Sequence, residues 1–223
     1  MPTQHTLQFL KNLDENNNRE WFQIHRNDYD QAKASFENLS RIILTNISQF
    51  QNDLHTTKVK DCIFRINRDI RFSKDKSPYK KFFSAGFGPG GRHSGKIDYY
   101  LQLQPNNETF IGGGMWSPTS AQLAAFRQEI DYNPAIINGI IYNDNFRRYY
   151  DKISGEKVKL MPKGYTADHP DIELLKYKEL FFYHKYTDEE VLDKDFAIKV
   201  TEGCYLLKPY IDYLNHLFFE NNQ

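Results

Sequence analysis

The sequence lacks several features that would assign it to a specialised class of protein. Its 223 residues contain only two cysteines, too few for a framework of disulfide bonds. No apolar run approaches the roughly 20 residues needed to span a bilayer, and the N-terminal residues lack the basic and apolar regions of a secretory signal. These absences predict a cytoplasmic protein with no membrane association, in which Cys62 and Cys204 are buried apolar residues.

An excess of charge of one sign is also absent, because 29 Lys and Arg residues balance 29 Asp and Glu residues. This balance argues against a protein dedicated to nucleic acids or to membrane surfaces. The seven histidines show no H-x-H or H-E-x-x-H spacing and no cluster with cysteine, so no metal site is predicted. The sequence likewise predicts no cofactor, and it does not define an oligomeric state.

Two glycine motifs lack the context that phosphate binding requires. Residues 86–91 match the dinucleotide fingerprint G-x-G-x-x-G, and residues 90–96 match the first seven positions of a phosphate-binding P-loop. Both motifs need a following helix, whose N-terminal N–H groups hold the phosphate. Residues 97–104 instead alternate like a strand, so we predict a long hairpin loop here and no nucleotide site.

The sequence does contain hydrophobic periodicity of two kinds. From residue 27 to residue 50, apolar residues recur at steps of three and four, which predicts a long helix with Asn27 as its N-cap. After about residue 58 the period becomes two. Residues 60–115 therefore predict an antiparallel meander of about four strands, the first of them at residues 62–67. The stretches 157–161 and 178–186 are candidates for further strands.

Shorter helices are predicted on both sides of this sheet. One covers residues 3–13, a second carries Trp21, and a third begins with Ser117 as N-cap and breaks near Pro134. A C-terminal helix follows a capping box formed by Thr187 and Glu190. No repeat or linker divides the chain, so residues 1–223 are predicted to form a single α+β domain with the sheet flanked by N-terminal and C-terminal helices.

The most unusual segment is RINRDIRFSKDKSPYKK, residues 65–81. From Lys58 to Lys81, nine basic residues stand against three acidic ones, a local charge of +6 in a neutral chain. Guanidinium groups suit phosphate or carboxylate. The candidate anion ligands of this segment are Arg65, Arg68, Arg71, Lys76 and Lys80. A strand continuing past Asn67 would place alternate residues from 65 to 73 on one face. A structural ion-pair network followed by a solvated turn explains the same residues equally well.

A second element could complete an anion site. Gly113 and Gly114 end a predicted strand that leads through Trp116 into the helix expected at Ser117. Glycines allow close approach of a backbone, and a helix N-terminus favours an anion, so these four residues are further candidate ligands. The alternative is a β-bulge that lets Trp116 pack.

Signals for catalysis are weak. The weak candidates are Asp69, Asp75, Lys76 and Tyr79. They could act as general acids or bases if they were buried together. Otherwise they are ion-pair partners.

The block RDIRFSKDKSPYKK, together with NNNREWF, GGGMWSP and PKGY, resembles a widespread family of conserved proteins of unknown function. The resemblance covers nearly the whole chain. It implies a single intracellular α+β domain and brings no established reaction, cofactor or partner.

Three functions remain open at this point. The first is binding of, and reaction with, a small phosphorylated or carboxylated molecule at the basic segment. The second is nucleic-acid binding by the same strip, with aromatic side chains stacking on bases: Phe72, Tyr79, Phe82 and Phe83. The third is a protein-interaction module that meets an acidic partner.

Overall fold

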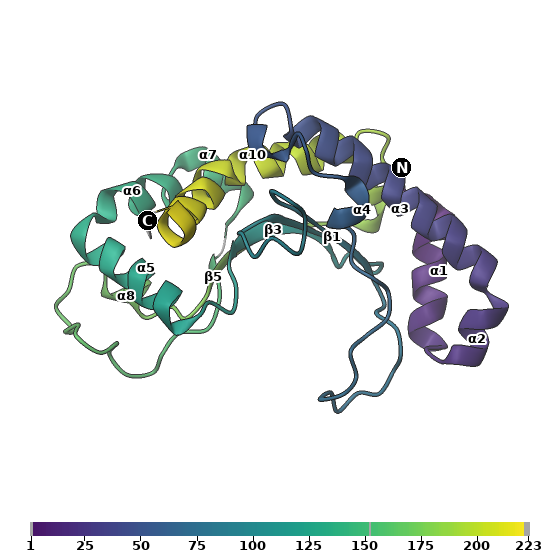
Figure 1. The fold of residues 1–223 in the computed structure, drawn as a ribbon, viewed down its shortest axis with the longest axis horizontal. Coiled ribbons are helices and arrows are strands. Elements are labelled where there is room, and N and C mark those ends of the chain that lie inside the picture. Colours follow the sequence, from purple (N-terminus) through teal and green to yellow (C-terminus); the bar gives the residue numbers. More distant parts are fainter. Residues whose placement is uncertain (1, 152, 221–223) are drawn as a thin grey trace. The chain divides into compact units, whose positions relative to one another are not determined.

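The computed structural model describes residues 2–151 and 153–220 (Figure 1). The chain divides into two compact units, each assembled from three separate segments. Unit 1 comprises Met1–Gly95, Tyr100–Ile111 and Lys185–Tyr205, and unit 2 comprises Lys96–Tyr99, Gly112–His184 and Leu206–Gln223. That residues 1–223 act as a single domain stays a prediction.

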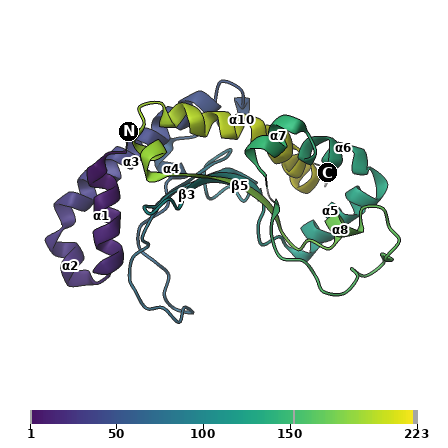
Figure 2. The same ribbon diagram turned by 180° about the vertical axis from the view of Figure 1, so that it is seen from behind.

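Unit 1 begins with three helices, α1 (Gln4–Glu15), α2 (Arg19–Ile24) and α3 (Arg26–Ile47). Helix α1 starts with a capping box between Thr3 and Thr6, which satisfies backbone N–H groups that a helix start leaves free. Helices α1 and α3 pack against each other and lie side by side in both views (Figures 1 and 2).

The predicted hydrophobic stripe of α3 is confirmed. Its fully buried members are Ala32, Phe36, Leu39, Ile43 and Ile47. The predicted N-cap Asn27 is wrong, because the helix begins earlier, at Arg26, with His25 in the capping position. There the Tyr29 N–H group donates to the His25 carbonyl, so Asn27 is already part of the first turn.

The strand expected at residues 62–67 is wrong as a regular strand. Residues 52–54 form a 3₁₀ turn, η1 (Asn52–Leu54), and a short helix follows, α4 (Val59–Cys62). Beyond α4 the chain does run antiparallel to residues 78–85, but only through the isolated bridges Ile63↔Ala85 and Asn67↔Tyr79. The alternation of apolar residues at positions 62–67 therefore corresponds to an extended segment with two isolated bridges, and not to a continuous β-strand.

The regular strands are β1 (Phe83–Phe87), β2 (Tyr99–Leu103), β3 (Thr109–Met115), β4 (Ile153–Ser154) and β5 (Leu180–Tyr186). They form one open antiparallel sheet in the order β1-β2-β3-β5-β4. The α+β fold class, with helices at both ends of the chain, is confirmed. Strand β5 lies within the candidate stretch 178–186. The stretch 157–161 forms only the bridge Lys157↔Tyr177.

No helix follows the glycine motifs at residues 86–96. Gly86 lies inside β1, and the next regular element after Gly95 is the strand β2. The strand predicted after these motifs is confirmed, so the helix N-terminus that both motifs need to hold a phosphate does not follow them.

In unit 2, three helices follow β3: α5 (Ser120–Tyr132), α6 (Pro134–Ile141) and α7 (Asp144–Tyr149). A fourth, α8 (Ile172–Leu175), lies between β4 and β5 in the sequence. The predicted break at Pro134 is confirmed. The predicted N-cap Ser117 is wrong, because Thr119 caps α5 in a capping box with Gln122.

The last elements are α9 (Asp188–Leu192), α10 (Phe196–Asn215) and the π-helical turn η2 (His216–Glu220). The capping box of Thr187 and Glu190 is confirmed at the start of α9. Pro209 lies inside α10. Cys62 and Cys204 are both buried, as predicted.

Candidate functional site

The basic segment forms a loop that links α4 to β1 in unit 1 (Figures 1 and 2). Two hydrogen bonds close its base: the Arg68 N–H group donates to the Pro78 carbonyl over 2.9 Å, and the Lys80 N–H group donates to the Ile66 carbonyl over 2.8 Å. No regular strand runs through residues 65–73, so the condition for placing alternate residues from 65 to 73 on one face is not met. The loop is ordered by its side chains instead.

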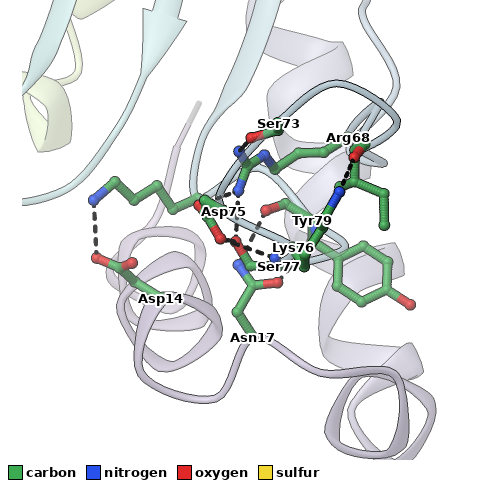
Figure 3. A network of polar contacts seen from close by, with 10 residues as sticks. Asp14, Asn17, Arg68, Ser73, Asp75, Lys76, Ser77 and Tyr79 are labelled. Carbon is green, nitrogen blue, oxygen red and sulfur yellow. Dashed lines mark hydrogen bonds and ion pairs between the residues drawn. The ribbon is translucent and has the colours of Figure 1, made fainter.

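Arg68 is the centre of that order (Figure 3). Its guanidinium group donates to the Asp75 carboxylate and to the Ser73 and Ser77 hydroxyls. Asp75 in turn accepts from the Ser77 N–H group at 2.9 Å and from the Ser77 hydroxyl at 2.6 Å. These contacts fix the guanidinium plane and join one end of the loop to the other.

Two exposed groups brace the outer part of the loop. The Arg71 guanidinium forms a two-pronged pair with the Asp69 carboxylate, with N–O distances of 2.9 Å and 2.6 Å. Lys76 donates to the Ile70 carbonyl at 2.9 Å. Exposed contacts of this kind add little stability singly, but together they hold the backbone of the loop.

The two carboxylates of the loop stay ionised at neutral pH. Hydrogen bonds from Arg71 lower the pKa of Asp69 to about 2. Hydrogen bonds from Ser77, and then from Arg68, lower the pKa of Asp75 well below its usual value. Neither group holds a proton that a general acid could donate near pH 7.

Tyr79 belongs to the wall of the site and to the core. Its ring is buried and stacks on Phe22 of α2, with 4.0 Å between the ring centroids. Asn17, in the turn between α1 and α2, bonds the Tyr79 backbone twice: its amide donates to the carbonyl at 3.0 Å and its oxygen accepts from the N–H group at 3.1 Å. This clamp fixes the loop against the N-terminal helices (Figure 3).

A pocket of about 460 Å³ lies between the loop and this turn. Its charged lining residues are three acids and three bases, and polar or aromatic residues complete it. They are Asp14, Asp69, Asp75, Arg68, Lys80 and Lys81, with Asn17, Ser77, Tyr79 and Phe82.

The charges of the pocket do not all pair. Arg68 pairs with Asp75, and Lys81 pairs with Asp14 at 3.4 Å. Asp69 pairs with Arg71 from outside the pocket. Within residues 2–151 and 153–220, Lys80 has no carboxylate at ion-pair distance.

The Lys80 side chain is half-buried and lies near two aromatic rings. Its ammonium nitrogen is 5.4 Å from the centroid of Phe64 and 5.8 Å from that of Phe82. Burial lowers the pKa of Lys80, and the positive charge of Arg65 lowers it further. Arg65 itself is exposed and is not among the lining residues.

The remaining candidates belong to unit 2. A Cβ atom on Gly113 would lie 2.8 Å from the Asp98 carbonyl oxygen, and one on Gly114 would lie 2.4 Å from the Leu180 oxygen. These glycines are therefore needed for close packing of the chain on itself. Trp116 is largely exposed and contacts Phe181 edge-on, with 5.8 Å between centroids. Ser117 has a φ of 45° and donates to Glu179.

Of the predicted site residues, the structure brings five together at this pocket of unit 1: Arg68, Lys80, Asp69, Asp75 and Tyr79. Arg65, Arg71 and Lys76 do not line it. That the basic residues and the Gly113–Ser117 segment of unit 2 together form one anion-binding pocket stays a prediction. Sequence reasoning missed Asp14 and Asn17. The block NNNREWF, which begins one residue before Asn17, was the signal that could have placed this turn beside the basic segment.

Other kinds of site find no support in the part of the chain that the structure describes. It contains no group of three or more His, Cys, Asp or Glu residues able to hold a metal ion. None of its described helices is long and apolar enough to cross a membrane.

Comparison with known proteins gives a match to a protein family. Searches of curated proteins and of solved structures found no match. The model of one family matches residues 5–213, which include the loop, the turn at Asn17 and the glycine segment. The chain therefore belongs to the family described as conserved hypothetical protein DUF2461.

Proposed function

We propose that the pocket of unit 1 binds a small phosphorylated or carboxylated molecule. One observation carries the proposal: Lys80 is a half-buried cation that lines the pocket and has no carboxylate partner among the described residues. A partly buried charge is costly unless a counter-charge accompanies it. An anionic ligand would supply that charge.

The rest of the pocket suits such a ligand. Its volume lies within the range of roughly 300–1,000 Å³ that is typical of small-molecule sites. The Arg68 guanidinium is already oriented by Asp75, Ser73 and Ser77, and its Nε–H group is in none of these contacts. A guanidinium held in place loses little entropy when it binds a planar acid group.

Thermal melts with phosphate or succinate test this function. We expect both anions to raise the melting temperature of the parent protein, because a ligand that binds only the folded state stabilises it by mass action, by about 2.7 kcal/mol at a concentration of 100 Kd. The shift should be much smaller for Lys80→Met. Without ligand, Lys80→Met should be as stable as the parent or more stable, since it removes repulsion from Arg65.

Lys74→Met is the matched control. Lys74 is exposed on the same loop and does not line the pocket, yet the change in net charge is the same. It should respond to phosphate like the parent. Equal shifts in all three proteins, or no shift in any of them, would contradict a site at Lys80.

Nucleic-acid binding is the second candidate, favoured by Phe72. Its side chain is 94% exposed, and the Arg71 guanidinium lies 5.8 Å from its ring centroid. Tyr79 and Phe83, which the sequence also offered for stacking, are buried. A single exposed aromatic on a basic loop can stack on one base.

Titration of a fluorescent single-stranded oligonucleotide at several salt concentrations tests this candidate. If the strip binds nucleic acid, log K should fall by roughly 0.7 for each phosphate contact per decade of salt. Phe72→Ala should then weaken binding at every salt concentration, because it removes the stacking partner. Weak binding with a shallow slope would leave the small anion as the ligand class.

A further inference from the structure

The amino group of Lys80 can do more than neutralise the charge of an anionic ligand, because an amine is also a nucleophile. We infer that Lys80 forms an imine with an aldehyde or ketone group of the anionic ligand, and this inference rests on the function proposed above. The ligand class is then a small carbonyl compound that also carries a phosphate or carboxylate group.

The position of the amine is fixed by its neighbours. The Lys80 backbone is held by its hydrogen bond to Ile66, and its side chain lies near the rings of Phe64 and Phe82. Lys80 lines the pocket, and so does Phe82. The other lysine of this pocket, Lys81, is tied to Asp14. Lys80 is therefore the lysine of the pocket that a ligand can reach without first breaking an ion pair.

The electrostatic surroundings favour the reactive form of the amine. The nucleophile is the neutral amine, and a carboxylate partner would hold the proton in place. Lys80 has no such partner within the described residues. Its pKa is lowered first by burial and then by Arg65, which are the two means by which proteins activate lysine for imine formation.

The reaction balances without a redox partner. The Lys80 nitrogen attacks the carbonyl carbon, and the carbonyl oxygen takes up a proton to give a carbinolamine. Loss of that oxygen as water forms the C=N bond, so one amine and one carbonyl give one imine and one water. The imine is protonated at neutral pH and restores the positive charge. The acid group of the ligand therefore keeps its counter-charge through the step.

Reductive trapping of the full-length protein tests the inference. The probe is glyoxylate, which carries both an aldehyde and a carboxylate, with cyanoborohydride to reduce any imine to a stable amine. Peptide mass spectrometry would follow the rate of modification at Lys80 and at Lys74, an exposed lysine outside the pocket. We expect Lys80 to be modified several times faster, and inorganic phosphate to slow modification at Lys80 alone.

The possible outcomes distinguish a failure of the imine hypothesis from a failure of the proposed anion binding. If phosphate stabilises the parent but Lys80 is modified no faster than Lys74, the imine is overturned and anion binding stands. If Lys80 is modified rapidly but phosphate neither slows it nor shifts the melting temperature, the anionic ligand class is overturned. Lys80→Met removes the amine, so modification at position 80 should disappear while the rate at Lys74 stays the same. A faster or slower rate at Lys74 in this variant would mean that the trapping does not report on Lys80 alone.

Discussion

The Asp98→Asn variant is expected to be more stable than the parent protein at pH 8 and to lose that advantage below about pH 4. Asp98 is partly buried, and burial raises the pKa of its carboxyl to about 7, although its own backbone N–H group offsets part of the rise. The folded protein therefore keeps a proton that the unfolded chain releases near pH 4. Parent stability should fall as the pH rises from about 4 to about 7.

The size of the effect follows from the shift in pKa. About three units correspond to roughly 4 kcal/mol at most, and Asn removes this penalty because it has no charge to bury. The segment has little freedom to move Asp98 into water, since Asn215 bonds both the N–H and the carbonyl group of the adjacent Ile97, at 2.9 Å and 3.0 Å.

Urea denaturation at pH 4, 6 and 8 measures the difference. Asp53→Asn is the control, because Asp53 is exposed; its effect on the free energy of unfolding should be small and nearly the same at each pH. If the curves of Asp98→Asn and of the parent run parallel from pH 4 to pH 8, the raised pKa of Asp98 is refuted.

The Gly114→Ala variant is expected to lose about 3 kcal/mol of stability or more. Gly114 has a φ of +139°, which is unfavourable for residues with a side chain. Its new Cβ atom would lie 2.4 Å from the Leu180 carbonyl oxygen and 2.9 Å from a ring carbon of Tyr210. Neither neighbour can move easily, since the Tyr210 hydroxyl donates to that same carbonyl at 2.8 Å. Strain and overpacking each cost roughly 1–3 kcal/mol.

Gly139→Ala provides the matched control in the same unit. Gly139 lies in α6, and nothing stands within 4 Å of the Cβ position. This substitution should raise stability by about 0.5–1 kcal/mol, because alanine favours a helix. Urea denaturation of both variants decides the matter. A Gly114→Ala protein as stable as the parent would mean that β5 and α10 do not approach Gly114 as closely as described.

Local sequence rules predicted most of the regular elements. The stripe of α3, the break before Pro134 and the capping box at Thr187 each depend on residues a few positions apart, and each is confirmed. The start of α5 was open to the same reasoning. Thr119 has Gln122 three residues later, which is the capping-box spacing, whereas Ser117 has no Glu or Gln there.

The candidate site was less predictable because its contacts join distant residues. The sequence shows nine cations between Lys58 and Lys81 but does not say which of them find partners. Lys81 is neutralised by Asp14, 67 positions away, and the adjacent Lys80 is not. The conformation of the loop also depends on hydrogen bonds between the Arg68 side chain and other side chains. Hydrophobic periodicity in a sequence cannot predict such contacts.

The interleaving of the two units has a consequence for synthesis on the ribosome. Residues 185–205, the last segment of unit 1, emerge only after most of unit 2 has been made. That segment brings buried residues such as Val191 and Phe196, and it brings Asp188, which accepts from Lys11 and from the backbone of Asn107. Domains often fold in order as they leave the ribosome. Here the N-terminal helices must wait for α9, so unit 1 can complete its core only after residues 185–205 have been made.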